Sequence, residues 1–174
     1  MPPDLHSHLH IAAIGLGSNL GNRARHLKAA TEALVRANGV TLISVSEAIV
    51  TPPIGPPGQQ QYLNAACTVR TSRTPRALLR LLQRIEGSRG RDRGNCMRWG
   101  PRTLDLDLLL YDEVVLDEPG LTIPHRRLHE RSFVLMPLAQ IAADMAVPTL
   151  GISVGEAWGA LSASAAGGAE DGLA

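Results

Sequence analysis

Residues 98–107, with the sequence RWGPRTLDLD, combine arginines and aspartates in a pattern suited to binding a metal ion and phosphate groups together. The alternation of leucine and aspartate over 104–108 predicts a β-strand with Asp105 and Asp107 on one face, roughly 7 Å apart. Carboxylates this close repel each other unless a cation lies between them, and Mg²⁺ favours one or two carboxylates together with substrate phosphates. Taken alone, the pattern also fits a solvent-exposed strand face.

The segment before this strand is rich in arginine. Between residues 84 and 102 there are six arginines against Glu86 and Asp92, whereas the net charge of the whole chain is only +1. An arginine-rich loop is usually solvated surface, but guanidinium groups also bind phosphate oxygens in a fixed fork and stay charged. Beside Asp105 and Asp107, these arginines indicate a site for a magnesium nucleotide, where both kinds of cation neutralise phosphate charge.

Other nucleotide and metal motifs fit less well. Lys28 is the sole lysine and does not follow a Gly-x-x-x-x-Gly loop, which excludes a P-loop. The glycines of 15–21 follow a predicted strand, but the third is one residue late for a dinucleotide-binding fingerprint, so a tight turn before a helix is favoured. His125 and His129 are four apart but lack the glutamate of a zinc protease motif, and the histidines near the N-terminus fit a mobile leader better than a metal cluster.

Composition sets the broad class. The 174 residues correspond to about one domain, and the 44% hydrophobic content with near-zero mean hydropathy is typical of a globular protein. No apolar run approaches the roughly 20 residues of a membrane span, and no secretion signal is recognisable, so we expect a cytoplasmic protein that does not contact membranes. Cys67 and Cys96 are expected to be free thiols. The small net charge excludes a globally basic nucleic-acid binder.

Periodicity predicts the order of elements. We expect strands at 11–16, 40–50, 62–71 and 104–111, a short strand at 114–116, and helices after 22, from Pro75 and after Pro124. This order favours an α+β fold, namely a ferredoxin-like β-α-β-β-α-β sandwich with an additional C-terminal helix and short extra strands. Residues 1–10 are expected to form a flexible leader, 11–161 a single domain, and 162–174 a disordered tail rich in alanine and glycine.

Six motifs, spread in order over residues 11–143, closely resemble the 6-hydroxymethyl-7,8-dihydropterin pyrophosphokinase family. They are GSNLG at 17–21, TPP with Gly55 at 51–55, YLNA at 62–65, QRIE at 83–86, the decapeptide at 98–107, and Pro124-His125 followed by Arg131 and Phe133. The resemblance implies an ATP-dependent transferase of folate biosynthesis. Its reaction would move pyrophosphate from ATP to the pterin hydroxymethyl group and release AMP.

The resemblance also implies roles on the ATP side of the site. Asp105 and Asp107 look like the ligands of two Mg²⁺ ions, and Arg91 and Arg102 like catalytic arginines, with Arg89 or Arg93 as alternatives to Arg91. Which carboxylate, if either, removes the hydroxyl proton is left open. The further residues implied to lie near ATP are Gln83, Glu86, Trp99 in a mobile loop that closes over the site, His125 and Arg131.

On the pterin side, the resemblance implies that Tyr62 and Phe133 sandwich the ring. Asn64 and groups near Thr51, Pro52 and Ile54 would read the hydrogen-bonding edge of the pterin. We expect ATP and the hydroxymethyl pterin as the partners of a monomer, with no nucleic acid. The alternative, a ferredoxin-like RNA-binding module, has few aromatics to stack on bases, and two aspartates would repel the RNA backbone.

Overall fold

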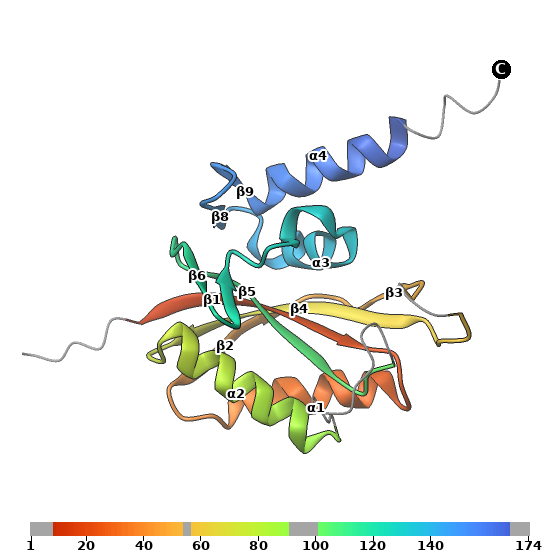
Figure 1. Ribbon diagram of the computed structural model, residues 1–174, viewed down its shortest axis with the longest axis vertical. Coiled ribbons are helices and arrows are strands. Elements are labelled where there is room, and N and C mark those ends of the chain that lie inside the picture. The colour runs from red at the N-terminus through yellow and green to blue at the C-terminus, as the bar shows by residue number, and fades with distance from the viewer. Residues whose placement is uncertain (1–8, 54–56, 91–100, 168–174) are drawn as a thin grey trace, which may run out of the picture.

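The computed structural model describes residues 9–53, 57–90 and 101–167, and its centre is an antiparallel sheet (Figure 1). Its strands lie in the order β2-β4-β1-β5, and the short strand β3 also pairs with β4. Their bounds are β1 His10–Ser18, β2 Val40–Val45, β3 Ile49–Thr51, β4 Tyr62–Thr71 and β5 Asp105–Tyr111. With two helices between these strands, the β-α-β-β-α-β order confirms the predicted fold class.

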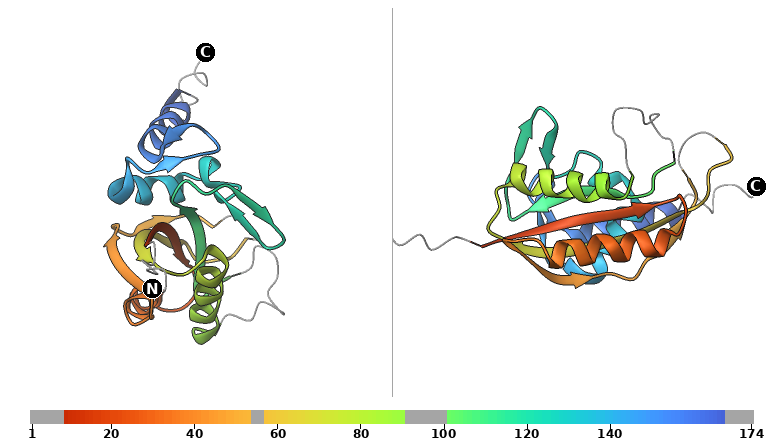
Figure 2. Two further views of the ribbon diagram at one scale, coloured as in Figure 1. Left: turned by 90° about the vertical axis from the view of Figure 1, so that its left-hand side faces the viewer. Right: turned by 90° about the horizontal axis from the view of Figure 1, so that it is seen from below.

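Helices α1 (Arg23–Val35) and α2 (Pro75–Ser88) cover one face of the sheet and lie beside each other (Figure 2). Both begin where the sequence offers a capping side chain. Asn22 accepts a hydrogen bond from the Arg25 N–H, and Thr74 accepts one from the Ala77 N–H in front of α2. Proline in the first turn of α2 costs no helical hydrogen bond, so both starts follow from local chemistry.

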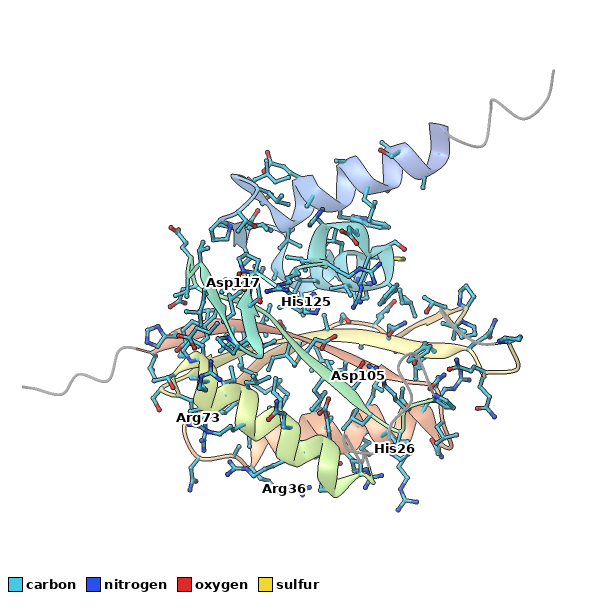
Figure 3. All side chains as sticks on the ribbon, viewed as in Figure 1. His26, Arg36, Arg73, Asp105, Asp117 and His125 are labelled. Carbon is cyan, nitrogen blue, oxygen red and sulfur yellow. The ribbon has the colours of Figure 1, made fainter. Side chains whose placement is uncertain are left out.

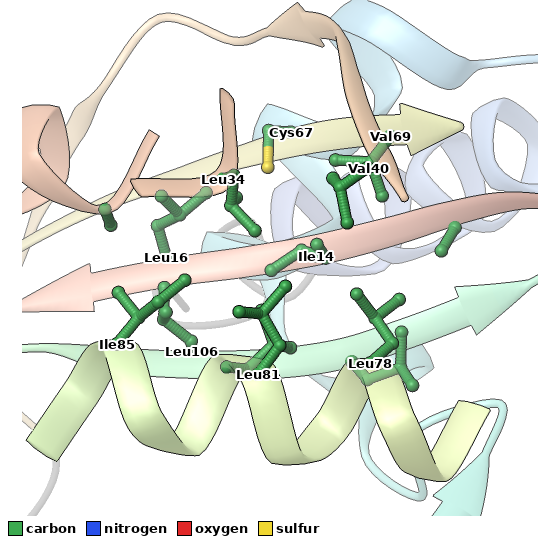
Figure 4. Close-up of a cluster of buried hydrophobic side chains, with 14 of the residues drawn as sticks. Ile14, Leu16, Leu34, Val40, Cys67, Val69, Leu78, Leu81, Ile85 and Leu106 are labelled. Carbon is green, nitrogen blue, oxygen red and sulfur yellow. The ribbon is translucent and has the colours of Figure 1, made fainter. Parts of the chain in front are cut away.

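The larger core lies between this pair of helices and the sheet (Figure 4). Leu78, Leu82 and Ile85 form the apolar stripe of α2 and contact a sheet face that includes Ile14 and Leu106. Each such side chain contributes about 1.5–3 kcal/mol when fully buried. Cys67 belongs to the same cluster as a free thiol, and burial raises its pKa to about 12.

Helices α3 (Ser132–Ala142) and α4 (Val154–Gly167) lie on the opposite side of the sheet, with α3 between the sheet and α4 (Figure 1). A second core cluster joins α3 and α4 to Ala13, Ala66 and Leu109 of the sheet. The remaining elements are the hairpin β6 Leu116–Glu118 and β7 Leu121–Ile123, the 3₁₀ helix η1 Leu128–Glu130, and the hairpin β8 Ala146–Val147 and β9 Ile152–Ser153. No described helix is long and apolar enough to cross a membrane.

Three predicted boundaries were wrong. The strand predicted at 40–50 is divided into β2 and β3, because side chains replace the ladder there: the Ser46 hydroxyl accepts from the Ala66 N–H and the Gln140 side chain accepts from the Glu47 N–H. The helix predicted after Pro124 begins only at Ser132, since the intervening residues form a turn and η1. The short strand predicted at 114–116 lies instead at β6.

The two ends of the predicted domain also differ from the structure. Residues 162–167, for which we predicted disorder, form the last turns of α4. Ser153 and Glu156 cap its start reciprocally, since each side chain accepts a hydrogen bond from the other residue's N–H, and the alanines that follow favour helix. His10, assigned to the leader, begins β1 and lies 2.6 Å from the Asp112 carboxylate. Residues 1–8 and 168–174 lie outside the described part of the chain.

Candidate active site

Strand β5 presents Asp105 and Asp107 to a cavity of about 420 Å³ that Phe133 and Val134 of α3 also line. Figure 3 labels Asp105 and His125, two of the residues of this cavity. Leu104, Leu106 and Leu108 point the other way and are at most 4% exposed. The alternation in the sequence therefore predicted the two faces of this strand correctly. The part of the chain that the structure describes contains no group of three or more acidic, histidine or cysteine side chains able to hold a metal ion. A metal ion bound by these two aspartates would complete its coordination with water or substrate oxygens.

Two glycines of β1 keep the floor of this cavity open. Gly17 pairs with Asp105 and Gly15 with Asp107, and cross-strand partners project to the same face of a sheet. A Cβ at Gly17 would lie 3.1 Å from Asn64 Oδ1 and 3.9 Å from Asp105 Cβ. Any larger residue at Gly17 would fill the space beside the carboxylate. This concavity and the oxygen-only pair of aspartates fit a hydrated divalent cation carrying phosphates.

One side of the cavity carries the side chains expected to bind pterin. Its lining includes Thr51, Pro52, Tyr62, Asn64 and Phe133. These residues come from β3, from β4, from the segment after β3 and from the first turn of α3, so tertiary structure alone brings them together. Asn64 Nδ2 donates to Thr51 Oγ1 at 2.7 Å, which fixes the amide and leaves its Oδ1 as an acceptor. Ile54, also expected here, lies outside the described residues.

The other side of the cavity is basic. Arg102, Arg127, Arg131 and His125 line it together with the two aspartates. Arg102 Nη1 lies 2.5 Å from Asp105 Oδ2. Burial lowers the pKa of Arg102, but the charge of Asp105 and its hydrogen bond outweigh this effect, and the pKa is raised. The Arg131 guanidinium lies 5.6 Å from the centre of the Phe133 ring, so the phosphate side and the aromatic side meet at this pair.

An irregularity in β5 places His125 next to Asp107. The register with β1 passes from Ala13–Leu110 to Ile14–Leu108 and leaves Leu109 as an unpaired extra residue, a β-bulge. The Leu109 carbonyl accepts instead the His125 N–H at 2.8 Å. Burial lowers the pKa of His125 and the charge of Arg131 adds to this, although Asp107 acts in the opposite direction. The ring is therefore mainly neutral at pH 7.

A second cavity, of about 660 Å³, opens between α2, β5 and the β6–β7 hairpin. Asp107 and His125 line both cavities, so the two are neighbours across these side chains. Gln83, expected near ATP, lines the second cavity only. Arg126 also lines it and donates to the Asp117 carboxylate at 2.8 Å, and this pairing lowers the pKa of Asp117.

The structure places Glu86 away from both cavities. Its side chain is fully buried and accepts the Leu106 N–H at 2.7 Å, which ties α2 to β5. This packing position does not fit the expected contact with ATP. Arg91 and Trp99, with the alternative Arg93, lie outside the described residues, and Arg89 bonds to His26 Nδ1 rather than lining either cavity.

Sequence reasoning missed six residues that line the site, namely Gly15, Leu16, Gly17, Ala65, Arg127 and Val134. The glycines could have been found, because two glycines at a spacing of two within a strand leave one face without side chains. Arg127 had no such signal. Arg126 lines the second cavity and Arg127 the first. Which of these neighbours faces the carboxylates depends on the chain conformation just before η1.

Comparisons with known proteins identify the family of this chain. Residues 13–143 match the family model of 7,8-dihydro-6-hydroxymethylpterin-pyrophosphokinase (HPPK). The chain is 43% identical over 137 residues to the 2-amino-4-hydroxy-6-hydroxymethyldihydropteridine pyrophosphokinase of Haemophilus influenzae, which covers 79% of this chain and 84% of that protein. It is 46% identical over 135 residues to the Bacillus subtilis protein of the same name, covering 78% and 80% respectively.

Solved structures of longer proteins share the fold. A crystal structure of HPPK-DHPS in complex with substrates has a TM-score of 0.67 at 14% identity, covering 89% of this chain and 44% of that one. A Plasmodium falciparum HPPK-DHPS triple mutant has a TM-score of 0.68 at 13% identity, covering 87% and 43%. This chain spans less than half of those chains, and at such identity the likeness shows the fold alone. From the family match and the closely related bacterial sequences, the chain belongs to the 7,8-dihydro-6-hydroxymethylpterin-pyrophosphokinase family.

Proposed function

We propose that this chain transfers pyrophosphate from ATP to the hydroxymethyl group of 6-hydroxymethyl-7,8-dihydropterin, releasing AMP, as a step of folate biosynthesis. One observation carries the proposal: a single cavity joins an aromatic half, formed by Tyr62 and Phe133, to a half formed by two carboxylates and three arginines. A flat ring and a polyphosphate bound there would meet at the boundary between the two halves. Membership of the family supports the same reaction.

Pterin would bind between Tyr62 and Phe133. Aromatic rings stack favourably on a flat heterocycle, and the chain has only five aromatic residues in all. Asn64 Oδ1 is available to accept from ring N–H groups, because Thr51 already accepts from the Asn64 Nδ2. The hydroxymethyl group would then point toward Asp105 and Arg102, which line the same cavity.

The triphosphate would lie over β5. Asp105 and Asp107 would hold two Mg²⁺ ions, which when bound neutralise and align phosphate oxygens. Arg127, Arg131 and the neutral His125 surround the same space and would donate hydrogen bonds to phosphate oxygens. Arg102, which pairs with Asp105 in this structure, would exchange that carboxylate for a phosphate oxygen when the nucleotide binds.

We place the nucleoside of ATP in the second cavity. It adjoins the first at Asp107 and His125, so a nucleotide lying across these two residues would have its phosphates in the basic half of the first cavity. Gln83 from α2 and Leu108 and Leu121 supply one amide and two apolar contacts for a purine base. The Arg76–Glu118 ion pair connects the first turn of α2 to the hairpin that forms the far wall.

The reaction itself requires alignment more than covalent chemistry. The hydroxymethyl oxygen forms a bond to the β-phosphorus as the bond from that phosphorus to the α–β bridging oxygen breaks, so AMP leaves and the hydroxyl proton passes to solvent or to a nearby base. Pre-positioned reactants and cancelled negative charge account for most of the rate in such transfers. In this chain Arg102 is the residue placed to stabilise charge on the transferred group, and the proton acceptor is unassigned.

We also propose that the protein acts as a monomer in the cytoplasm. The RNA-binding alternative is disfavoured by the position of α3, which packs against β4 on the sheet face that such modules leave open for bases.

The test is magnesium-dependent formation of AMP that requires the hydroxymethyl pterin. We expect Asp107→Ala to abolish turnover without unfolding the protein, since the buried leucine face of β5 is unchanged, and chelation of Mg²⁺ to do the same. Glu32→Ala is the matched control, because this exposed carboxylate pairs with Arg36 on α1 and lines neither cavity. A folded wild-type protein that forms no AMP with both substrates and Mg²⁺ would reject the proposal.

A further inference from the structure

Asn19, directly after β1, connects two segments that reach the cavity from different parts of the chain. Its side chain is almost completely buried, with 1% exposed. On one side, the Asn19 N–H donates to the Arg102 carbonyl at 3.0 Å, and Asn19 Oδ1 accepts the Arg102 N–H at 2.7 Å. On the other side, Asn19 Nδ2 donates to Gln59 Oε1 at 3.0 Å and to the Gln60 carbonyl at 3.4 Å.

The bonds to Arg102 fix the base of a side chain that the reaction needs. Both main-chain polar groups of Arg102 bind Asn19, and the neighbouring Ser18 hydroxyl donates to the Thr103 carbonyl at 2.6 Å. With its backbone held at two points, Arg102 can reach Asp105 at 2.5 Å from a defined position. Because the main chain of Arg102 is already fixed, only its side-chain torsions remain to be ordered when the guanidinium binds phosphate.

The bonds to Gln59 and Gln60 act on the pterin side. These residues directly precede β4, which begins at Tyr62 and carries Asn64. The Gln61 carbonyl is also held, because Arg23 Nη1 donates to it at 2.6 Å. The segment before Tyr62 is therefore held by Asn19 and by Arg23 at the start of α1. Of these two residues, Asn19 also binds the main chain of Arg102.

We infer that Asn19 is a positioning residue for pyrophosphoryl transfer: its acceptor holds Arg102 in place for the phosphates, and its donors hold the segment that carries the pterin-stacking Tyr62. This inference rests on the proposed function. The acceptor and the donors of the Asn19 side-chain amide thus have different roles. Loss of the acceptor should lower kcat through Arg102, whereas loss of the donors should raise KM for the pterin.

A double-mutant cycle tests the first half. We expect Asn19→Ala to lower the single-turnover rate of AMP formation by about tenfold when Arg102 is present, the size of effect produced by one buried hydrogen bond. In the Arg102→Ala background, the same substitution should change the already slow rate by less than about twofold, because the group it positions is missing. Equal losses in both backgrounds would overturn the inference and leave Asn19 a purely structural residue.

Gln59→Ala tests the second half at a half-buried position where folding is not at risk. It removes the nearer of the two acceptors of Asn19 Nδ2 and leaves the Arg102 bonds intact, so we expect a severalfold higher pterin KM with kcat and the ATP KM unchanged. A fall in kcat with an unaltered pterin KM would contradict the assignment.

Asn22→Ala serves as the control for lost stability. It removes the cap of α1, at a cost of about 1 kcal/mol, without touching Arg102 or Gln59. We expect its kcat and both KM values to equal those of the wild type, and a kcat loss matching that of Asn19→Ala would overturn the inference. An inactive wild type would reject the proposed function, whereas an active wild type with an additive cycle rejects only the role of Asn19.

Discussion

Substitution of Gly17 by alanine tests the geometry of the pterin side directly. The added Cβ would lie 3.1 Å from Asn64 Oδ1, so the amide must move by a few tenths of an ångström. Asn64 cannot retreat freely, because its Nδ2 is bound to Thr51 Oγ1 at 2.7 Å. The substitution therefore misaligns the acceptor that we assign to the ring N–H groups of pterin.

The expected loss can be estimated from that one hydrogen bond. A misaligned buried bond costs about 1–1.5 kcal/mol, which corresponds to roughly fivefold to tenfold weaker pterin binding at 25 °C. Crowding in the sheet should also lower the free energy of unfolding by about 1–3 kcal/mol. The cavity assigned to the nucleoside does not include Gly17, but the added Cβ would lie 3.9 Å from Asp105 Cβ, so we expect affinity for a non-hydrolysable ATP analogue to fall less than affinity for pterin.

Isothermal titration with pterin and with the ATP analogue measures both affinities, and urea denaturation measures stability. Gly155→Ala in α4 is the matched control, since its Cβ would lie 3.2 Å from the Ala143 carbonyl oxygen, away from either cavity. We expect the control to bind pterin like the wild type. The reasoning is refuted if Gly17→Ala binds pterin with wild-type affinity while Asn64→Ala binds it weakly, because crowding by the added methyl group would then have no effect on the amide.

Three further outcomes follow from the structure. Phe133→Ala removes one of the two rings proposed to stack on pterin, so it should weaken pterin binding about tenfold and leave binding of the ATP analogue largely unchanged. Calorimetry that showed an equal loss of affinity for both ligands would contradict the stacking role. Glu86→Ala should lower the free energy of unfolding by about 1–3 kcal/mol in urea titrations, because the buried Leu106 N–H loses its carboxyl acceptor; a change below about 0.5 kcal/mol would show that this bond is not needed. The hydrogen bond from the Ser153 backbone N–H lowers the pKa of Glu156 in the folded protein. The ionised Glu156 side chain therefore stabilises the fold at pH values above its unfolded-state pKa, and this stabilisation is lost as the pH falls through the lower folded-state pKa. The stability difference between the wild type and Glu156→Gln should therefore shrink from pH 7 to pH 3, and a difference that grew on acidification would reverse the sign of the argument.

The parts of the site that depend on local periodicity could be predicted from the sequence. Asp105 and Asp107 share a face because alternation in a strand needs no tertiary information. Pro75 and Asn22 mark helix starts for equally local reasons. The division of the lining into a pterin side and a phosphate side came only from the family resemblance, since its members lie far apart along the chain.

Other features depended on contacts that the sequence does not display. Glu86 follows Leu82 at a spacing of four and so lies on the buried stripe of α2, a signal that could have predicted its packing role. Arg126 and Arg127 are chemically identical neighbours, and which one faces the carboxylates depends on the turn that follows His125. The break between β2 and β3 arises from bonds to Ser46 and Gln140, which involve distant strands and helices.

Because of the bulge at Leu109, the active site depends on the number of residues in β5 as well as on their identity. Deleting this one residue would allow β5 to pair with β1 without interruption and would remove no polar side chain. Yet the deletion would take away the carbonyl that receives the His125 N–H, while Leu110 and Tyr111 would keep their faces, because Leu109 and Leu110 together stand opposite Ala13. A chain with every arginine, aspartate and histidine in its order would then lack the bond that ties His125 to the strand that carries Asp107. An apolar residue that contributes only its main-chain carbonyl thus helps to hold a histidine of the site.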